Sequence, residues 1–398
     1  MLTMTPHTQN ADVRLVGESN GADCRTIQDA HDDLPDGDEE GRLGSGLIVV
    51  DSSYDGSHEE FPIRITKYID VIGQSRTSSQ VVCDDPDVDV FHVIKRTDEN
   101  TPAKRVRMAN LTVEGGRDGV VLDGANYFSA SFVTVLGAAR DGFAGVRKPG
   151  IGGVFGGYFE RCYVRYCGRH GFSFPPPTNA HGFALHRCSG TENGGFGALL
   201  NGFGIGIFGG AYQINGDAGV VLEGGGEMGT GAVGLHNTYV EYNGSVQTHP
   251  RDVVLGDEVR GATLHNCYIT GAREFDDAET HAAVESRDNA DCRIDHCTFR
   301  GYGWCEEAGL FDISDDTSRL DLNLGSHHRF HGADETNTFL RRPAQFYSNG
   351  VRHGNDPLSE AGRYDGEFAY ADGRLWVWSA DDGTWNGCGE SETRRPGA

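Results

Sequence analysis

Residues 264–269 read Leu-His-Asn-Cys-Tyr-Ile, and residues 294–299 read Ile-Asp-His-Cys-Thr-Phe. Both phrases place an apolar residue, two polar residues, a cysteine and two β-formers in the same order, and residues 235–240 repeat that order with Thr in place of Cys. The starts of these phrases, at 235, 264 and 294, lie 29 and 30 residues apart, and a related phrase begins 50 residues earlier at Leu185. A period made only of short strands and Gly-containing turns is typical of a β-solenoid, in which each repeat forms one coil.

Four cysteines occupy the same position of this repeat. A single coil cannot enclose apolar side chains, but stacked coils hydrogen-bond strand to strand and share one core. We therefore expect these cysteines to point inward in neighbouring or next-neighbouring coils, as a column of buried thiols. Parallel side-chain vectors in coils about 4.8 Å apart favour reduced thiols, so no disulfide is predicted among them. They are Cys162, Cys188, Cys267 and Cys297.

The order of the first elements resembles that of the right-handed parallel β-helix (pectin-lyase-like) family. An amphipathic helix pattern at 26–34 is followed by apolar stretches at 46–50, 61–65 and 69–73. In that family a helix covers the open end of the first coil, where strand edges would otherwise be unpaired. The resemblance implies an all-β chain, with a flexible segment at 1–12, a right-handed parallel β-helix with its cap at 13–345, and a small β module at 346–398.

The composition is strongly acidic and poor in lysine. The chain carries 34 Lys and Arg against 59 Asp and Glu, a net charge of −25, which argues against a nucleic-acid partner. Such a surface is typical of halophilic proteins, in which molar salt screens the repulsion between carboxylates. No apolar run is long enough to span a membrane. Residues 1–14 lack the apolar centre of a secretory signal, which favours assembly in the cytoplasm over secretion.

Three successive repeats carry the tripeptide Arg-x-Gly at the same turn, at 117–119, 140–142 and 169–171. Stacking would align their first residues in one column and their second residues in the next. Paired acids beside a histidine could hydrolyse a glycosidic bond, and a column of arginines could hold an acidic sugar for β-elimination. The simpler interpretation, which we favour, is turn chemistry, because Asp bonds nearby backbone and Gly accepts a positive φ. The candidate residues are Arg117, Arg140, Arg169, Asp118, Asp141 and His170.

The ordered catalytic motifs of polygalacturonase-like and pectate-lyase-like members of the family do not occur in this sequence, so the resemblance implies the fold and not the activity. Carboxylates at 84, 85, 87 and 89 could bind calcium through oxygen ligands. We favour the interpretation that they are solvated loop carboxylates. We therefore predict no metal site and no cofactor, with calcium as the alternative.

The C-terminal segment differs from the repeats. Residues 367–371, an Asp-Gly turn and residues 374–379 predict a β-hairpin, and a second turn leads into Thr384 and Trp385. The pattern is similar to short modules near the ends of tail-fibre and head-decoration proteins of tailed viruses. The resemblance implies an assembly or contact role for Trp376, Trp378 and Trp385, whereas a plain β cap would use the same rings as a core.

These observations predict a structural or host-recognition protein of a virus that infects a halophile, such as a tail fibre, spike or capsid-surface decoration. The expected partners are sister chains in a homotrimer, other particle proteins and a host surface glycan or glycoprotein, with no membrane insertion. The expected location is the virion, or the extracellular space as the alternative. The competing function is an enzyme, either a polysaccharide lyase or a glycoside hydrolase acting on acidic glycans.

Overall fold

The computed structural model describes residues 12–35, 46–94, 103–146, 153–224, 229–247, 250–271, 282–287 and 290–300, together with individual strands up to residue 394. The chain forms two compact units, residues 1–216 and residues 217–398. The described residues contain one α-helix and many short strands. None of the described helices is long and apolar enough to cross a membrane.

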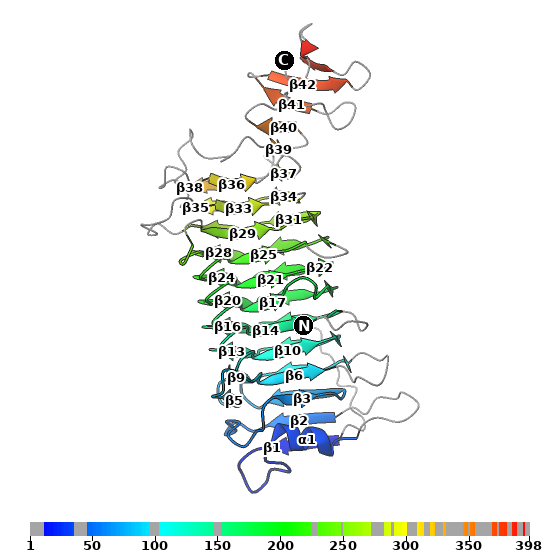
Figure 1. Cartoon of the computed structure of the whole chain (residues 1–398), viewed down its shortest axis with the longest axis vertical. Coiled ribbons are helices and arrows are strands. Elements are labelled where there is room, and N and C mark those ends of the chain that lie inside the picture. The colour runs from blue at the N-terminus through cyan, green and yellow to red at the C-terminus, as the bar shows by residue number, and fades with distance from the viewer. Residues whose placement is uncertain are drawn as a thin grey trace. The chain divides into compact units, whose positions relative to one another are not determined.

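In the first unit the strands form three parallel series, whose stacked arrows are visible in Figure 1, and from residue 69 to residue 200 each coil contributes one strand to every series. Series A contains β1 (Asp12–Val16), β2 (Gly46–Val50), β4 (Ile69–Gly73), β8 (Arg107–Ala109), β12 (Ser129–Ser131), β15 (Tyr158–Glu160), β19 (Ala184–His186) and β23 (Gly206–Phe208). Series B contains β3 (Ile63–Ile65), β6 (Phe91–Ile94), β10 (Val120–Asp123), β14 (Phe143–Val146), β17 (Phe172–Phe174) and β21 (Ala198–Leu200). Series C contains β5 (Gln80–Cys83), β9 (Thr112–Gly115), β13 (Thr134–Leu136), β16 (Tyr163–Arg165), β20 (Ser189–Thr191) and β24 (Ala211–Gln213).

The second unit repeats the same three kinds of strand. Series A continues as β27 (Gly234–His236), β31 (Ala262–His265), β34 (Asp291–Asp295), β37 (Arg319–Leu322) and β39 (Gln345–Ser348). Series B comprises β25 (Val220–Leu222), β29 (Arg251–Leu255), β33 (Ala282–Ser286) and β36 (Gly309–Ile313). Series C comprises β28 (Tyr239–Glu241), β32 (Tyr268–Thr270), β35 (Thr298–Arg300) and β38 (Arg329–His331). The parallel series confirm the predicted right-handed parallel β-helix.

Short two-residue strands form a fourth series between series B and series A. They are β7 (Ala103–Lys104), β11 (Ala125–Asn126), β18 (Ala180–His181) and β22 (Gly202–Phe203) in the first unit, and β26 (Thr230–Gly231) and β30 (Val259–Arg260) in the second. Isolated bridges join Phe155 to Asn126 and to His181, so this edge continues through the coil of β15.

The repeated sequence phrase is explained by a left-handed residue between series A and series C. Asn266 and His296, the third residues of their phrases, have φ values of 52° and 54°. In the first unit Arg161 and Arg187 hold the same position at 52°. One residue in this conformation bends the chain sharply from one sheet into the next, and Asn tolerates it better than most residues.

The four cysteines predicted to face inward are buried and free. Cys162 and Cys188 lie in neighbouring coils of the first unit, and Cys267 and Cys297 do so in the second, each at most 2% exposed. The Sγ atom of Cys267 donates to the carbonyl oxygen of Leu235 at 3.3 Å. The predicted register and the predicted absence of disulfides among these thiols are both confirmed.

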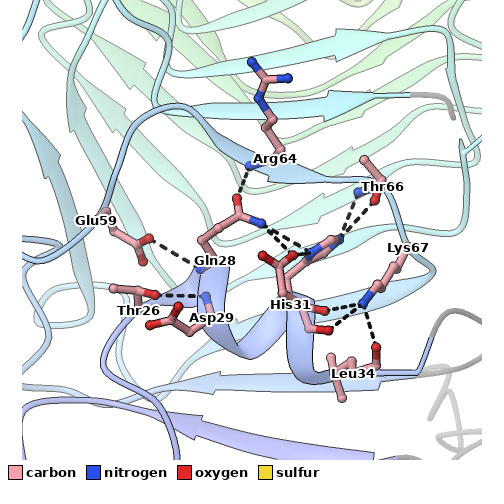
Figure 2. Close-up of polar contacts among 10 residues, drawn as sticks. Thr26, Gln28, Asp29, His31, Leu34, Glu59, Arg64, Thr66 and Lys67 are labelled. Atoms are coloured by element: carbon pink, nitrogen blue, oxygen red, sulfur yellow. Dashed lines mark hydrogen bonds and ion pairs between the residues drawn. The ribbon is translucent and has the colours of Figure 1, made fainter. Parts of the chain in front are cut away.

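Helix α1 (Ile27–Asp33) covers the first coil, as the sequence predicts. Its inward residues Ile27 and Ala30 are fully buried, and Thr26 caps its start by accepting the N–H of Asp29 at 2.9 Å. A helix of two turns is marginal alone, so contacts with the coil must hold it. Figure 2 shows that residues 59–67 supply them, including the hydrogen bond from the N–H of Thr66 to Nε2 of His31 at 3.1 Å.

One of the chain's few lysines closes the other end of α1. The ammonium group of Lys67 donates to the carbonyl oxygens of His31, Asp32 and Leu34 at 2.8, 3.0 and 2.6 Å (Figure 2). These carbonyls lie at the C-terminal end of the helix, where the regular helical hydrogen bonds are missing and the negative end of the dipole lies. The His31 oxygen also accepts the N–H of the C-cap residue Leu34 at 3.3 Å. A cation at this position therefore fixes the cap to the first coil.

The C-terminal segment forms the predicted antiparallel module. Strand β39 pairs antiparallel with β40 (Val351–Gly354), and β40 pairs parallel with β41 (Phe368–Ala371). Strand β41 then pairs with β42 (Arg374–Ser379), and β42 pairs with β43 (Thr384–Gly387), which pairs with β44 (Thr393–Arg394). The predicted domain limits at residues 12 and 345 remain predictions.

Candidate functional site: an arginine–aspartate ladder

The six residues predicted as catalytic candidates lie in two neighbouring columns, as the sequence spacing requires. The register of β10, β14 and β17 pairs Val120 with Phe143 and Phe143 with Phe172. The residues two positions earlier, Asp118, Asp141 and His170, therefore occupy successive coils. Their arginine neighbours form the adjoining column.

Each arginine binds the aspartate of the preceding coil with two nitrogen atoms. Arg140 donates from Nε to Oδ1 of Asp118 at 2.9 Å, and its Nη2 pairs with Oδ2. Arg169 makes the same pair of contacts with Asp141, with Nε to Oδ1 at 2.7 Å. The hydrogen bond and the charge of the carboxylate raise the pKa of each guanidinium. Two-pronged pairs of this kind fix direction as well as charge.

The carboxylates also bind the backbone of the next coil. Oδ1 of Asp118 accepts the N–H of Asp141 at 3.0 Å, and Oδ1 of Asp141 accepts the N–H of His170 at 3.2 Å. Asp118 is fully buried and Asp141 is 1% exposed, whereas the arginine side chains that cover them are nearly half exposed. The buried carboxylates of the ladder thus lie between coils, and the guanidinium groups that bind them lie nearer the solvent.

His170 takes the place of an aspartate at the top of this column. Its Nδ1 accepts the N–H of Phe196 at 3.0 Å, and its ring stacks on the Phe196 ring with centroids 4.6 Å apart. Burial lowers the pKa of His170 to about 4. The acceptor role and the lowered pKa agree, because a protonated Nδ1 could not accept the Phe196 N–H.

The first carboxylate of the ladder corrects a sequence interpretation. Asp89 was grouped with the solvated or calcium-binding carboxylates, but it is only 4% exposed. Both of its oxygens accept from Arg117, each at 2.9 Å. Asp89 is therefore the lowest rung of the ladder, one coil before Asp118. Asp84, Asp85 and Asp87 are exposed as expected.

This geometry limits what the ladder can do chemically. A general acid or base must reach the proton that it transfers, directly or through one water molecule. The carboxylate oxygens of Asp118 and Asp141 instead face guanidinium groups and backbone N–H groups within the protein. The arrangement favours cohesion between coils over contact with a substrate.

A second group of charged residues, which the sequence did not reveal, lies on series B of the second unit. Glu285 on β33 pairs with Arg251 of the preceding coil and accepts from Nε of Arg287 at 2.7 Å. Burial raises the pKa values of two nearby carboxyl groups, Asp217 and Glu223. The Glu223 carboxylate lies against Gly256, where a Cβ atom would stand 2.7 Å from its Cδ. These residues are 70 positions apart in sequence at their extremes, from 217 to 287, so only coil stacking brings them together.

No group of three or more His, Cys, Asp or Glu side chains able to hold a metal ion occurs in the described part of the chain. The calcium alternative therefore stays a prediction.

The three C-terminal tryptophans form a core. Trp385 is fully buried, and Trp376 and Trp378 are 2% and 6% exposed. The rings of Trp378 and Trp385 lie 5.3 Å apart at 60° to one another. This burial is the core packing expected of a plain β cap, and the assembly or contact role of Trp376, Trp378 and Trp385 stays a prediction.

Similar solved structures are parallel β-helix proteins. The A-module of the mannuronan C-5 epimerase AlgE4 from Azotobacter vinelandii has a TM-score of 0.53 at 15% identity, over 81% of this chain and 94% of that chain. ORF18 of Geobacillus virus E2 has a TM-score of 0.45 at 13% identity, over 88% of this chain and 64% of that one. An alginate lyase from Paenibacillus sp. str. FPU-7 has a TM-score of 0.45 at 11% identity, over 81% and 96%. Bacteriophage tailspikes also occur among the matches.

The likeness to the epimerase module shows a common fold and nothing finer at this identity. TM-scores below 0.5 support no further argument. No protein-family model matches the sequence, and no curated protein matches it.

Proposed function

We propose that this protein is a structural or host-recognition component of a virus particle, a tail fibre, spike or surface decoration, and that the host is halophilic. The β-helix serves as the scaffold and the C-terminal module as the attachment or contact element. The halophilic host rests on the charge of −25 and on a basic complement made almost wholly of arginine.

The observation that carries this proposal is the C-terminal module. Its strands β41–β43 form an antiparallel meander after a parallel solenoid, and its core is built from three tryptophans. The same segment has the sequence pattern of terminal modules in tail-fibre and decoration proteins. A separate module that follows the solenoid in the sequence suits attachment to a particle or to a host surface.

The arginine–aspartate ladder also supports this proposal, because it weakens the enzymatic alternative. The residues that most resembled a catalytic set are engaged in contacts between coils, with both aspartates at most 1% exposed. A recognition protein needs a stiff scaffold, and a ladder of charge-assisted hydrogen bonds supplies stiffness.

Immunogold electron microscopy of particles released by the source culture tests the proposal. Antibodies against the full chain are expected to label the outside of the particles at a regular position. Labelling confined to the particle-free supernatant, with clean particles, would contradict a virion role and favour a secreted protein.

A second function is favoured by the charged group on the second unit. Asp217 and Glu223 have raised pKa values beside Arg251 and Arg287, which is the environment of a general acid that acts on a glycan. Glu223→Gln should then abolish release of shorter products from polygalacturonate in molar salt. Glu258→Gln, an exposed glutamate on the same unit, is the control and should retain the activity. Absence of products from the unmodified chain rules this function out for that polysaccharide.

A further inference from the structure

One side of the first unit carries an unusual number of exposed rings. It is formed by the outward residues of β8, β12, β15, β19 and β23 with the short strands and turns beside them, and we call it the aromatic face. Tyr127, Tyr158 and Phe208 are 59%, 40% and 38% exposed. The face is defined by Arg105, Arg107, Tyr127, Phe132, Phe155, Tyr158, Glu160, Arg161, His181, His186, Arg187, Phe203 and Phe208.

The rings stand in two columns that follow the coil spacing. In the first column the His186 ring lies 5.2 Å from Tyr158 and 4.7 Å from Phe208. In the second, the His181 ring lies 5.3 Å from Phe155 and 5.4 Å from Phe203. Strand register pairs His186 with Phe208 and His181 with Phe203, and an isolated bridge joins Phe155 to His181. Tyr158 is paired with Ala184, two positions before His186, and its ring reaches the first column from there.

Two glycines allow the rings of Phe208 and Tyr127 to pack closely against the backbone. A Cβ atom on Gly206 would stand 2.3 Å from the ring of Phe208, and one on Gly156 would stand 2.7 Å from the ring of Tyr127. Each ring therefore covers a glycine, and the Cβ atom of any other residue at that position would displace the ring. The two rings thus lie close to the backbone, which suits contact with another broad surface better than insertion into a pocket.

The charge of this face is opposite to that of the molecule. Arg105, Arg107, Arg161 and Arg187 against Glu160 give 4 − 1 = +3, which leaves −25 − 3 = −28 for the rest of the chain. Asp70 lies 4.0 Å from Arg107 at the edge of the face, and including it still gives +2. Specific protein interfaces are enriched in aromatic residues and Arg and depleted in Asp, Glu and Lys, which matches this composition.

We propose that the aromatic face is the site at which a second copy of this chain docks, with the acidic surface of one copy against the arginines of the other. Two copies of the face would repel if they met, because both are positive. The contact is therefore heterologous, and repeated contacts of this kind close into a ring or extend into a filament. A ring of three is the predicted homotrimer. This inference does not depend on a viral origin.

The size of the face predicts a moderate affinity. Five coils at about 4.8 Å by about seven residues at roughly 3.3 Å give roughly 500 Å² on one copy. Two opposed surfaces then bury about 1,000 Å², the lower limit for a specific interface. Assembly should therefore depend on protein concentration.

The test is sedimentation of the full chain in molar potassium chloride across protein concentration. Arg161→Glu with Arg187→Glu reverses charge at two left-handed positions, where the chain already accepts glutamate at Glu192 and Glu258. The control, Arg64→Glu with Arg76→Glu, makes the same change in net charge at exposed arginines outside the face. Tyr158→Ser with Phe208→Ser removes rings without changing charge. Unfolding in urea verifies that each variant is folded.

The unmodified chain and the control should form oligomers of the 43.0 kDa chain with the same dissociation constant. Each folded face variant should weaken association at least about tenfold, or roughly 1.4 kcal/mol. If the unmodified chain stays monomeric at a protein concentration on the order of 100 µM, its dissociation constant exceeds that concentration and any self-association is very weak. That result overturns the proposal. Equal weakening by the control overturns it too, because net charge would then be the cause. Face-dependent retention of a monomer on immobilised polygalacturonate would identify an acidic glycan as the occupant instead.

Discussion

The Asp118–Arg140 pair shows how single residues hold one coil on the next. The carboxylate is buried, but the guanidinium that covers it remains partly solvated. Removing one partner of a buried pair costs far more than the pair contributes net, because the remaining buried group loses its compensation. Asp118 is therefore more important to the fold than its place in a three-residue turn motif suggests.

Replacement of Asp118 by Asn should lower the free energy of unfolding by about 1–3 kcal/mol. The amide can still accept the N–H of Asp141, but it loses the charge that binds Arg140. Urea unfolding in molar potassium chloride measures the loss, and Asp87→Asn, at an exposed loop position, is the matched control. Equal midpoints for the two variants would show that the ladder contributes nothing.

His170 gives the ladder a pH dependence. Its pKa is about 4 in the folded protein, against about 6.5 unfolded, so the unfolded chain binds more protons between these values. Stability from this residue is complete above pH 6.5 and is lost as the pH falls toward 4, by up to roughly 3 kcal/mol. His170→Gln cannot titrate, so the difference in unfolding free energy between the two proteins should change between pH 7 and pH 4.5. A constant difference would show that His170 does not titrate as described.

At the scale of elements, the sequence predicts those helices, strands and turns that depend on a local residue pattern. Helix α1, the hairpin of β41 and β42, and the inward cysteines follow from periodicity and turn residues. The repeated sequence phrase also contains the left-handed residue, which is Asn266 in one coil and His296 in the next. Only the φ values show why a residue at this position recurs in every phrase. The columns of Arg140 and Asp118 were also aligned correctly.

The partners within those columns could not be predicted. Arg140 lies beside Asp141 in sequence but pairs with Asp118, and that choice depends on how each side chain leans along the coil axis. The Glu223 and Arg287 neighbourhood depends on three coils of different length. A spacing rule gives the column of a residue and not its contacts.

Lys67 should be essential for the cap. Lys67→Met keeps an apolar stem of similar length but leaves the carbonyls of residues 31, 32 and 34 without their cation, at a cost of about 1–3 kcal/mol. Amide exchange in α1 should speed up while exchange in β14 and β17 changes little. Arg76→Met serves as the exposed control. Unchanged exchange in α1 would mean that the cap is held by other contacts.

At the scale of the whole molecule, charge is the dominant feature. At about 0.1 M salt the Debye length is about 10 Å, so carboxylates repel across neighbouring coils, whereas at about 1 M it is about 3 Å. The melting temperature should therefore fall as potassium chloride is reduced from about 2 M to about 0.1 M. Sorbitol at matched osmolality should not restore it. A melting temperature that is independent of salt would contradict the halophilic interpretation.

The central claim is that the arginine–aspartate ladder builds the fold and catalyses nothing. The most direct test measures the reducing ends that are released from polygalacturonate and dextran in molar salt. It compares the unmodified chain with the double variant Asp118→Asn with Asp141→Asn, under conditions in which both proteins are folded. The ladder account predicts equal product formation, including none from either protein, together with a lowered urea midpoint for the double variant. Products from the unmodified chain that disappear in the double variant, with an unchanged midpoint, would contradict it and make the ladder an active site.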